Sequence, residues 1–358
     1  MEGLRGFAVL LVFFVHYADL VHPWIAEDEA LLALADALAT VGNSGVDLFF
    51  VLSGYVIYGS VISRYQPFVP FLARRIERIY PAFTTVFALY FALSFVFPAE
   101  NKIPESPGDG ALYLLQNFLL LPGLFPIKPM ITVAWSLSYE LFYYIAIPVL
   151  VAAFKLRRRS PTWRAIFFVA LAATFAAYTA LNDGPVRLLM FVAGIVLFEA
   201  IHHSRLRPSS IAGLVALFTG LLSMLLPVAG PAGTTLKVAI LGVTFFVLCL
   251  ACFRTPHSWL PRAFAWTPLR WLGNMSYSYY LLHGLALNGA FLALSKVMPP
   301  TGQDSTLFWL LLPPMLALTL LASALLFLLI ERPFSLAPRR KRDAPRLPHA
   351  ASASESGS

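Results

Sequence analysis

Long apolar stretches separated by short polar segments run through the chain. A helix needs about 20 apolar residues to cross a bilayer core of about 30 Å. We therefore predict about ten transmembrane helices, at residues 4–22, 42–62, 79–98, 131–154, 164–181, 187–201, 210–228, 237–253, 275–296 and 307–330. Residues 111–121 are apolar but too short to span, so we expect them to lie in or re-enter the outer membrane interface. The pattern predicts an all-α integral membrane protein.

The distribution of Lys and Arg between these stretches predicts the topology. With both termini in the cytosol, the inner segments hold 21 basic residues and the outer segments hold 5. Cytosolic loops of membrane proteins carry such an excess. Adding or removing one span would scramble the alternation, so we predict that both termini are cytosolic.

Composition agrees with membrane solvation and excludes other classes. The 358 residues are 59% hydrophobic and 12% charged, whereas soluble domains carry roughly 25% charged residues. The net charge of +8 does not indicate nucleic acid binding, because the basic residues stand in short runs between apolar segments. We expect a membrane domain over residues 1–334 and a disordered, basic cytosolic tail over 335–358. Cys249 and Cys252 lie in an apolar segment, which indicates packing residues.

Four ionisable residues stand out inside the predicted spans, where a charge costs free energy and usually marks a cavity or a site. They are His16, Asp47, Glu140 and His283. Arg5 precedes His16 by close to three helical turns, so the two side chains share one face, about 16 Å apart. Asp19 is placed to orient the imidazole of His16. The alternative is that Arg5 is a topology anchor and His16 a satisfied polar residue in a helix contact.

The second and fourth spans surround their carboxylates with small or hydroxyl-bearing residues. Asp47 shares a face with Gly54, which lets a helix or a ligand approach closely. Pure helix packing explains the glycine but leaves Asp47 unexplained. Glu140 lies inside the fourth span, with Ser136 and Tyr144 one turn away on either side. A stripe of hydroxyls around a carboxylate suits a polar acceptor such as a sugar.

Other polar and aromatic residues each allow two interpretations. Trp135 and Tyr139 belong either to this acceptor stripe or to an interfacial aromatic belt. His283 joins a polar stripe in the ninth span that is either a site or a hydrogen-bonded packing contact. Arg75 and Arg78 either clamp phosphates through bidentate bonds or anchor the topology. No metal is expected, because the histidines and carboxylates show no ligand spacing.

Six segments, taken together and in order, resemble the bacterial membrane family called acyltransferase 3. They are Gly3–Ala8 with His16, Gly45–Gly54, Arg74–Pro81, Trp135–Tyr143, Ser276–His283 and Glu331–Pro333. The match covers about residues 2–334, and the six segments in order are highly specific although each alone is weak. The resemblance implies acyl-CoA, in particular acetyl-CoA, as donor, transfer to a carbohydrate hydroxyl, about ten helices and a catalytic His16.

The chain departs from the family pattern at both ends. The family usually has Asp before Gly-Leu-Arg, so either the native start lies upstream of Met1 or Glu2 takes the place of that Asp. No extracytoplasmic hydrolase-like domain follows the last predicted span, as it does in some members. The membrane domain is then expected to act alone or to hand its acyl group to a separate extracytoplasmic protein.

The residues and the resemblance together support the hypothesis of an inner-membrane O-acyltransferase acting on a glycan, a glycolipid or another lipid-linked acceptor. The assigned residues are His16, Glu140 and Asp47 in catalysis, Arg5, Arg75 and Arg78 at the donor, and Trp135, Ser136, Tyr139 and His283 at the substrate. His16 is either the general base or a transiently acylated nucleophile. The alternative is a secondary transporter or flippase for a glycan, with the same residues as a proton path. No inverted repeat and no matching Gly- or Pro-broken helices are visible in the sequence, which counts against transport.

Overall fold

The computed structural model describes residues 1–300 and 305–336, and this part of the chain is helical without a named β-strand. The helices are α1 Glu2–Val21, α2 Glu29–Gly42, α3 Ser44–Ile62, α4 Phe68–Val96, α5 Pro107–Phe118, α6 Trp135–Ala153, α7 Pro161–Leu181, α8 Leu189–His203, α9 Ser210–Ser223, α10 Gly230–Arg254, α11 Trp259–Phe264, α12 Thr267–Asn274, α13 Ser276–Val297 and α14 Thr306–Leu326. A π-helical segment, Phe327–Leu336, continues α14. Short 3-10 turns precede α6 at Thr132–Ala134 and α8 at Val186–Leu188.

Nine helices in the described part of the chain are long and apolar enough to cross a membrane. They match nine of the ten predicted spans, and the all-α membrane fold is confirmed. The remaining prediction, 210–228, falls on α9, which has 14 residues and is shorter than a standard span. Residues 111–121 fall largely on the short helix α5. The predicted tail, apart from its first two residues, lies outside the described residues.

The segment before the second span is helical, which the sequence pattern did not predict. Only Asn43 separates α2 from α3, so Glu29–Ile62 forms one apolar stretch of 34 residues. The side chain of Asp28 caps α2 by accepting a hydrogen bond from the backbone N–H of Leu31. Asp28 and Glu29 therefore begin a helix in a segment outside the predicted spans.

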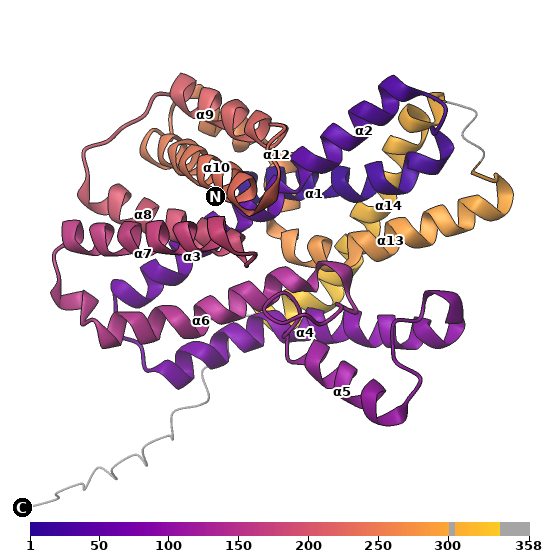
Figure 1. Ribbon diagram of the computed structural model, residues 1–358, viewed down its shortest axis with the longest axis horizontal. Helices are drawn as coiled ribbons and strands as arrows, with labels where there is room; N and C mark the ends of the chain where they lie inside the picture. Colours follow the sequence, from indigo (N-terminus) through magenta and orange to yellow (C-terminus); the bar gives the residue numbers. More distant parts are fainter. Residues whose placement is uncertain (301–304, 337–358) are drawn as a thin grey trace, which may run out of the picture.

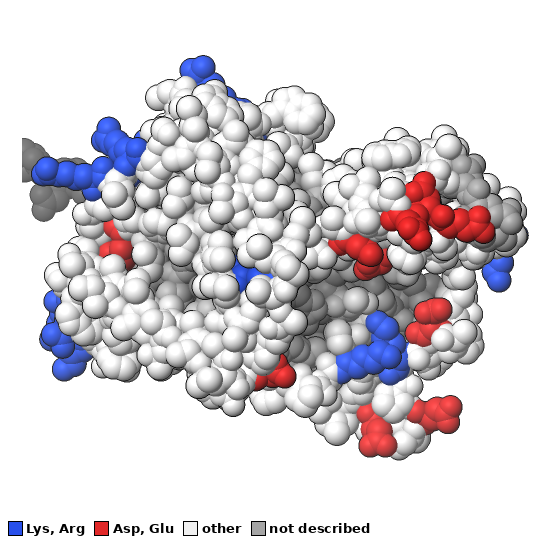
Figure 2. Space-filling model, turned by 45° about the horizontal axis from the view of Figure 1, so that its top comes forward, with Lys and Arg blue, Asp and Glu red and all other residues white. Residues whose placement is uncertain are grey.

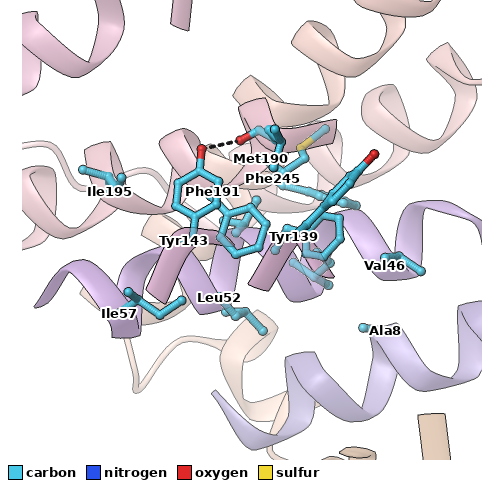
Figure 3. Packing of buried hydrophobic residues seen from close by; sticks show 14 of the residues in the cluster. Ala8, Val46, Leu52, Ile57, Tyr139, Tyr143, Met190, Phe191, Ile195 and Phe245 are labelled. Atoms are coloured by element: carbon cyan, nitrogen blue, oxygen red, sulfur yellow. Dashed lines mark hydrogen bonds between the residues drawn. The ribbon is translucent and has the colours of Figure 1, made fainter. Parts of the chain in front are cut away.

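Buried apolar side chains form two clusters centred on two groups of helices, and α13 and α14 contribute residues to both. The smaller cluster joins α1, α2, α13 and α14, drawn on the right of Figure 1. The larger one includes α3, α6, α8 and α10 (Figure 3), where the ring of Tyr143 stacks on Phe191 at a centroid distance of 4.0 Å. α1 contributes to both clusters, because Leu4, Ala8 and Val12 face the larger one. It therefore lies where the two groups meet.

Two glycines allow the close helix contacts that fix this junction. A Cβ built on Gly6 would lie 1.9 Å from the carbonyl oxygen of Leu269, so α12 packs directly on the start of α1. A Cβ on Gly54 would lie 2.2 Å from the carbonyl oxygen of Phe191, so α3 and α8 also touch through their backbones. The contact at Gly6 fixes the start of α1, which carries Arg5. The contact at Gly54 holds α3 against α8 within the larger cluster.

The surface in Figure 2 agrees with burial in lipid. Most of the face shown is uncharged, with basic side chains mainly toward the left end and acidic ones toward the right. Large apolar side chains such as Ile166, Val243 and Leu329 are exposed along the spanning helices, each more than 60% accessible. Exposed apolar belts of this kind are expected where lipid replaces water as solvent.

Candidate active site

A polar cavity lies inside the apolar bundle, between α1, α3, α4, α6 and α13. Its polar lining consists of Arg5, Ser53, Arg78, Ser136, Glu140, Tyr144, Ser276, Tyr277 and Tyr280. Val46, Phe49, Phe50, Ile79 and Leu137 supply the apolar walls. The cavity has a volume of about 70 Å³. At roughly 10–15 Å³ per water molecule, this is room for about five waters or a short acyl group.

One end of the cavity carries charges that are not paired with each other. Arg5 and Arg78 come from α1 and α4, and Glu140 comes from α6. In the described structure, neither arginine forms an ion pair with Glu140 or Glu331 within 4.0 Å, although Arg5 lies within electrostatic reach of both carboxylates. Glu140 accepts a hydrogen bond from the hydroxyl of Tyr144 instead. The two guanidinium groups therefore face the cavity with their donors available.

Arg75 lies beside this end but does not line the cavity. Its guanidinium group lies 5.4 Å from the ring centroids of both Phe71 and Tyr144, and its Nη2 is 3.4 Å from the hydroxyl of Ser60. Because the ring of Tyr144 forms part of the lining, Arg75 adds positive charge one side chain away from Arg78. The predicted arginine pair is thus held near one cavity, with Arg78 inside it and Arg75 at its margin.

Glu331 links the last segment of the chain to the same end. It is buried and accepts hydrogen bonds from the backbone N–H of Ser278, at 3.1 Å, and from its hydroxyl, at 2.6 Å. The contact ties the π-helical segment to the start of α13. The Glu-Arg-Pro motif that the sequence left without a role therefore holds one wall of the cavity in place.

A hydroxyl cluster forms another part of the wall. The hydroxyl of Tyr280 lies 2.8 Å from that of Ser136 and donates to the carbonyl oxygen of Val133 at 3.0 Å. The three groups join α13 to α6 and to the turn before it. Gly284 is buried one helical turn beyond Tyr280 on the same face, and a Cβ built there would meet nothing within 4 Å. There is therefore local open space beside Gly284.

His16 and His283 lie next to each other beyond Tyr280. Their ring centroids are 5.1 Å apart, and the ring of Tyr280 is 6.1 Å from that of His283. His16 is half-buried and is not part of the cavity lining, whereas His283 is fully buried. Asp19 is exposed, and within the described residues it makes no hydrogen bond or ion pair with His16. The neighbour that the fold gives to His16 is thus His283.

Asp47 occupies a different place, outside the cavity. It is fully buried near the start of α3, with a carboxylate oxygen 3.5 Å from Nη1 of Arg187. The guanidinium group of Arg187 lies 5.6 Å from the ring centroid of Trp135, which meets Tyr139 edge-on at 5.5 Å. Trp135 and Tyr139 also contact Phe50, whose ring lines the cavity. These residues form a second polar cluster against the cavity wall.

The structure thus distributes the ten predicted site residues over three adjoining places. Arg5, Arg78, Ser136 and Glu140 line the cavity, Arg75 lies at its margin, His16 and His283 pair beyond Tyr280, and Asp47, Trp135 and Tyr139 surround Arg187. Several residues of the site were not assigned from the sequence, among them Arg187, Tyr280 and Glu331. The polar stripe of the ninth span already contained Tyr280, but the basic residue count alone gave no reason to single out Arg187.

Comparison with known proteins identifies the family. The profile described as an acyltransferase domain matches residues 1–328. The chain belongs to the acyltransferase 3 family. It is therefore a multi-pass membrane acyltransferase, and the resemblance inferred from the six segments is confirmed.

Several curated relatives extend over most of the chain. Acyltransferase MdmB of Streptomyces mycarofaciens is 27% identical over 93% of this chain and 90% of its own length. The exopolysaccharide production protein ExoZ of Rhizobium meliloti is 27% identical over 85% of this chain and 92% of its own length. Peptidoglycan O-acetyltransferase OatA of Listeria monocytogenes is 26% identical over 79% of this chain but 48% of its own length. No solved structure matches the chain.

Proposed function

We propose that this acyltransferase 3 member is an inner-membrane O-acyltransferase that moves an acetyl group from acetyl-CoA to a hydroxyl of a cell-surface or exported glycan or glycolipid. The observation that supports this proposal most strongly is the cavity, with unpaired arginines at one end. The His16–His283 pair lies beyond Tyr280, which belongs to the hydroxyl cluster in its wall. Relatives named as a peptidoglycan O-acetyltransferase and an exopolysaccharide production protein support a glycan acceptor.

The donor belongs at the arginine end. Arg5 and Arg78 offer planar guanidinium groups that suit bidentate bonds to phosphate oxygens, and Arg75 adds charge at the margin. Glu140, which the sequence hypothesis placed in catalysis, lines this end and holds Tyr144, so we assign it to the donor site. A relative named as a peptidoglycan O-acetyltransferase supports acetyl as the acyl group.

The acceptor belongs on the other side of Tyr280. There is open space beside Gly284, one turn from Tyr280, and the ring of His283 lies 6.1 Å from that of Tyr280. Trp135 and Tyr139 present aromatic rings next to the cavity wall, a surface type that packs against sugar rings. Asp47 contributes by holding Arg187 against Trp135 rather than by touching the reacting atoms.

In the proposed reaction, His16 is the general base. One ring nitrogen of His16 takes the proton of the acceptor hydroxyl while that oxygen attacks the thioester carbonyl carbon. A C–O bond forms, the C–S bond then breaks, and the thiolate of CoA takes the proton back from the imidazolium. The products are the O-acyl ester and free CoA, with His16 regenerated.

Substitution of His16 tests this assignment. His16→Ala is expected to reduce transfer of label from [14C]acetyl-CoA to the cell-envelope acceptor by about 10²–10⁴-fold, the usual contribution of a general base. His22→Ala is the matched control, because His22 is an exposed histidine just after the same helix. Near wild-type turnover of His16→Ala would contradict the assignment. Glycan movement without label transfer would support the transporter alternative instead.

The same proposal predicts that the two substrates enter from opposite sides. Arg5 lies at the predicted cytosolic end of α1 and His16 about three turns farther along it. In oriented membrane vesicles, a membrane-impermeant acceptor should be acylated only at the outer face, with acetyl-CoA supplied only at the inner face. Full activity with both substrates confined to the cytosolic face would contradict this geometry while leaving the acyltransferase class intact.

A further inference from the structure

The two ring nitrogens of His283 have different surroundings. Nδ1 lies 2.8 Å from the backbone carbonyl oxygen of Tyr279. Nε2 is buried and finds no hydrogen-bond partner among the described residues. A buried polar atom without a partner is costly, and such an exception needs a physical reason. A group that explains the unpaired Nε2 atom must therefore lie beside the ring of His283.

The contact with Tyr279 determines which nitrogen carries the hydrogen. A carbonyl oxygen only accepts, so Nδ1 of His283 must donate. In the neutral imidazole, Nε2 then holds a lone pair and is an acceptor. His283 therefore presents a buried, unused acceptor at a fixed position.

The neighbouring ring is that of His16. The two imidazoles come from α13 and α1, with centroids 5.1 Å apart and planes at 54°, a spacing at which ring edges are in contact. An imidazole that acts as a base needs a second group to hold its other nitrogen. Asp19 is within electrostatic reach of His16, but it is exposed and makes no hydrogen bond or ion pair with it among the described residues, so it does not hold a ring nitrogen.

The scaffold around His283 holds its ring still. The ring stacks on Tyr279 at 5.2 Å and 9°, and the Tyr279 hydroxyl lies 2.9 Å from that of Thr319 on α14. α1 is fixed to the same helix, because the hydroxyl of Tyr17 donates to the carbonyl oxygen of Phe308. α1, α13 and α14 also pack against one another along their lengths, so the separation of the two histidines is set by three packed helices rather than by a loop or by one hydroxyl contact.

We infer that His283 is a positioning residue for His16, with Nε2 of His283 accepting an N–H of His16 during turnover. This bond leaves the other nitrogen of His16 with the lone pair that takes the acceptor proton, and it stabilises the imidazolium once formed. Bonds of this kind are often long in an empty site and tighten when substrate binds. The inference rests on the proposed role of His16 as the base.

Two substitutions separate this role from simple packing. His283→Gln places an amide oxygen near the position of Nε2 and keeps an acceptor for His16. His283→Asn has a shorter side chain whose amide reaches only the Nδ1 position. Tyr279→Phe is the matched control, because it removes the hydroxyl contact with Thr319 but keeps the stacked ring and the backbone carbonyl. All are made in the full chain.

Kinetics with [14C]acetyl-CoA in membrane vesicles that carry the native acceptor give the first readout. His283→Asn should lower kcat about 10–100-fold, the usual cost of losing an orienting partner, with little change in the KM for acetyl-CoA. His283→Gln and Tyr279→Phe should stay within about fivefold of wild type. Equal loss in Gln and Asn, or wild-type kcat in Asn, would overturn the inference. A change confined to the acceptor KM would also overturn it, because it would make His283 a substrate contact.

Nitrogen-15 NMR of the purified, histidine-labelled protein gives a readout that needs no turnover. His283 should show the Nδ1–H tautomer, and the ring signals of His16 should move in His283→Asn but not in His283→Gln. Unchanged His16 signals in His283→Asn would refute the pairing. If His16→Ala keeps full activity, the proposed role of His16 fails first; if His16→Ala is inactive and His283→Asn is unimpaired, only the pairing fails.

Discussion

Two buried charge clusters in the same bundle show opposite ways of holding ions away from water. The closed cluster joins α7, α8 and α3, where Arg164 bonds both carboxylate oxygens of Glu199, at 2.6 and 2.8 Å, and Tyr58 donates to the same carboxylate. The open cluster, around Arg5, Arg78 and Glu140, contains no described ion pair within 4.0 Å and faces a cavity.

The difference separates structural charge from functional charge. An ion in a membrane span needs a partner, and in the closed cluster the protein supplies every one of them. In the open cluster the arginines keep free donors, so water or a ligand must satisfy them. The two clusters contain the same types of residue. They differ in whether the fold supplies hydrogen-bond partners for the charged groups. The predictions below test that distinction, beginning with the largest expected effect.

Breaking the closed cluster should cost stability and leave donor binding unchanged. Glu199→Ala strands Arg164 as a buried charge and should lower the free energy of unfolding by about 3–5 kcal/mol. Tyr58→Phe, which keeps the ion pair, should cost no more than about 1–3 kcal/mol. Thermal unfolding in detergent measures both. A Glu199→Ala protein that is stable but binds acetyl-CoA poorly would place this cluster in the site.

Breaking the open cluster should instead weaken donor binding and leave the stability of the protein unchanged. Arg78→Ala should weaken acetyl-CoA binding by about tenfold to a hundredfold, since bonds to charged groups contribute about 1.5–3 kcal/mol. Arg78→Lys should restore only part of the affinity, because a point charge cannot reproduce the guanidinium fork. Arg262→Ala, an exposed cation on α11, is the control for net charge. If both alanine variants bind the donor like wild type, Arg78 is a topology anchor.

The open space beside Gly284 allows a test of whether the acceptor binds in the region beyond Tyr280. Gly284→Leu should fill that space and reduce turnover by about tenfold or more through misplacement of the acceptor. Stability should not fall much, because replacing a helical glycine raises helix propensity. Gly289→Leu is the matched control, since Gly289 is on the same helix and equally unobstructed but exposed. Equal activity of the two variants would show that the space is unused.

Much of the fold followed from the spacing of apolar residues, because nine spans are long enough for hydrophobic length alone to define them. The exceptions have local causes. α2 lies between two predicted spans, and its start is capped by the side chain of Asp28. α9 was predicted too long because the apolar residues after Ser223 lie in a turn before Pro227 rather than in the helix.

The site was predictable along single helices but not between them. Helical periodicity put Arg5 and His16 on one face of α1. It also favoured Asp19 as the partner of His16, because a lone sequence shows only local neighbours. The neighbour in the fold, His283, is on a helix far along the chain. Glu199 was overlooked for the same reason: its partner Arg164 had been counted among the inner basic residues.

The smallest expected effect comes from replacing Glu with Gln in each cluster. This change also discriminates best between the clusters, because it should strengthen donor binding in the open cluster and lower stability in the closed one. Glu140→Gln keeps an amide oxygen for the hydroxyl of Tyr144 but removes a negative charge beside Arg5 and Arg78. Binding of CoA, an anion, should therefore tighten by about twofold to fivefold, within the roughly 1 kcal/mol typical of partly solvated charge pairs. The gain should shrink at high salt. In the closed cluster, Glu199→Gln should instead lower the unfolding temperature, because the bidentate ion pair with Arg164 is lost. Titration calorimetry in nanodiscs and thermal unfolding measure the two effects. Weaker CoA binding in Glu140→Gln would contradict this electrostatic account, and a loss of stability matching that of Glu199→Gln would show that both clusters are structural.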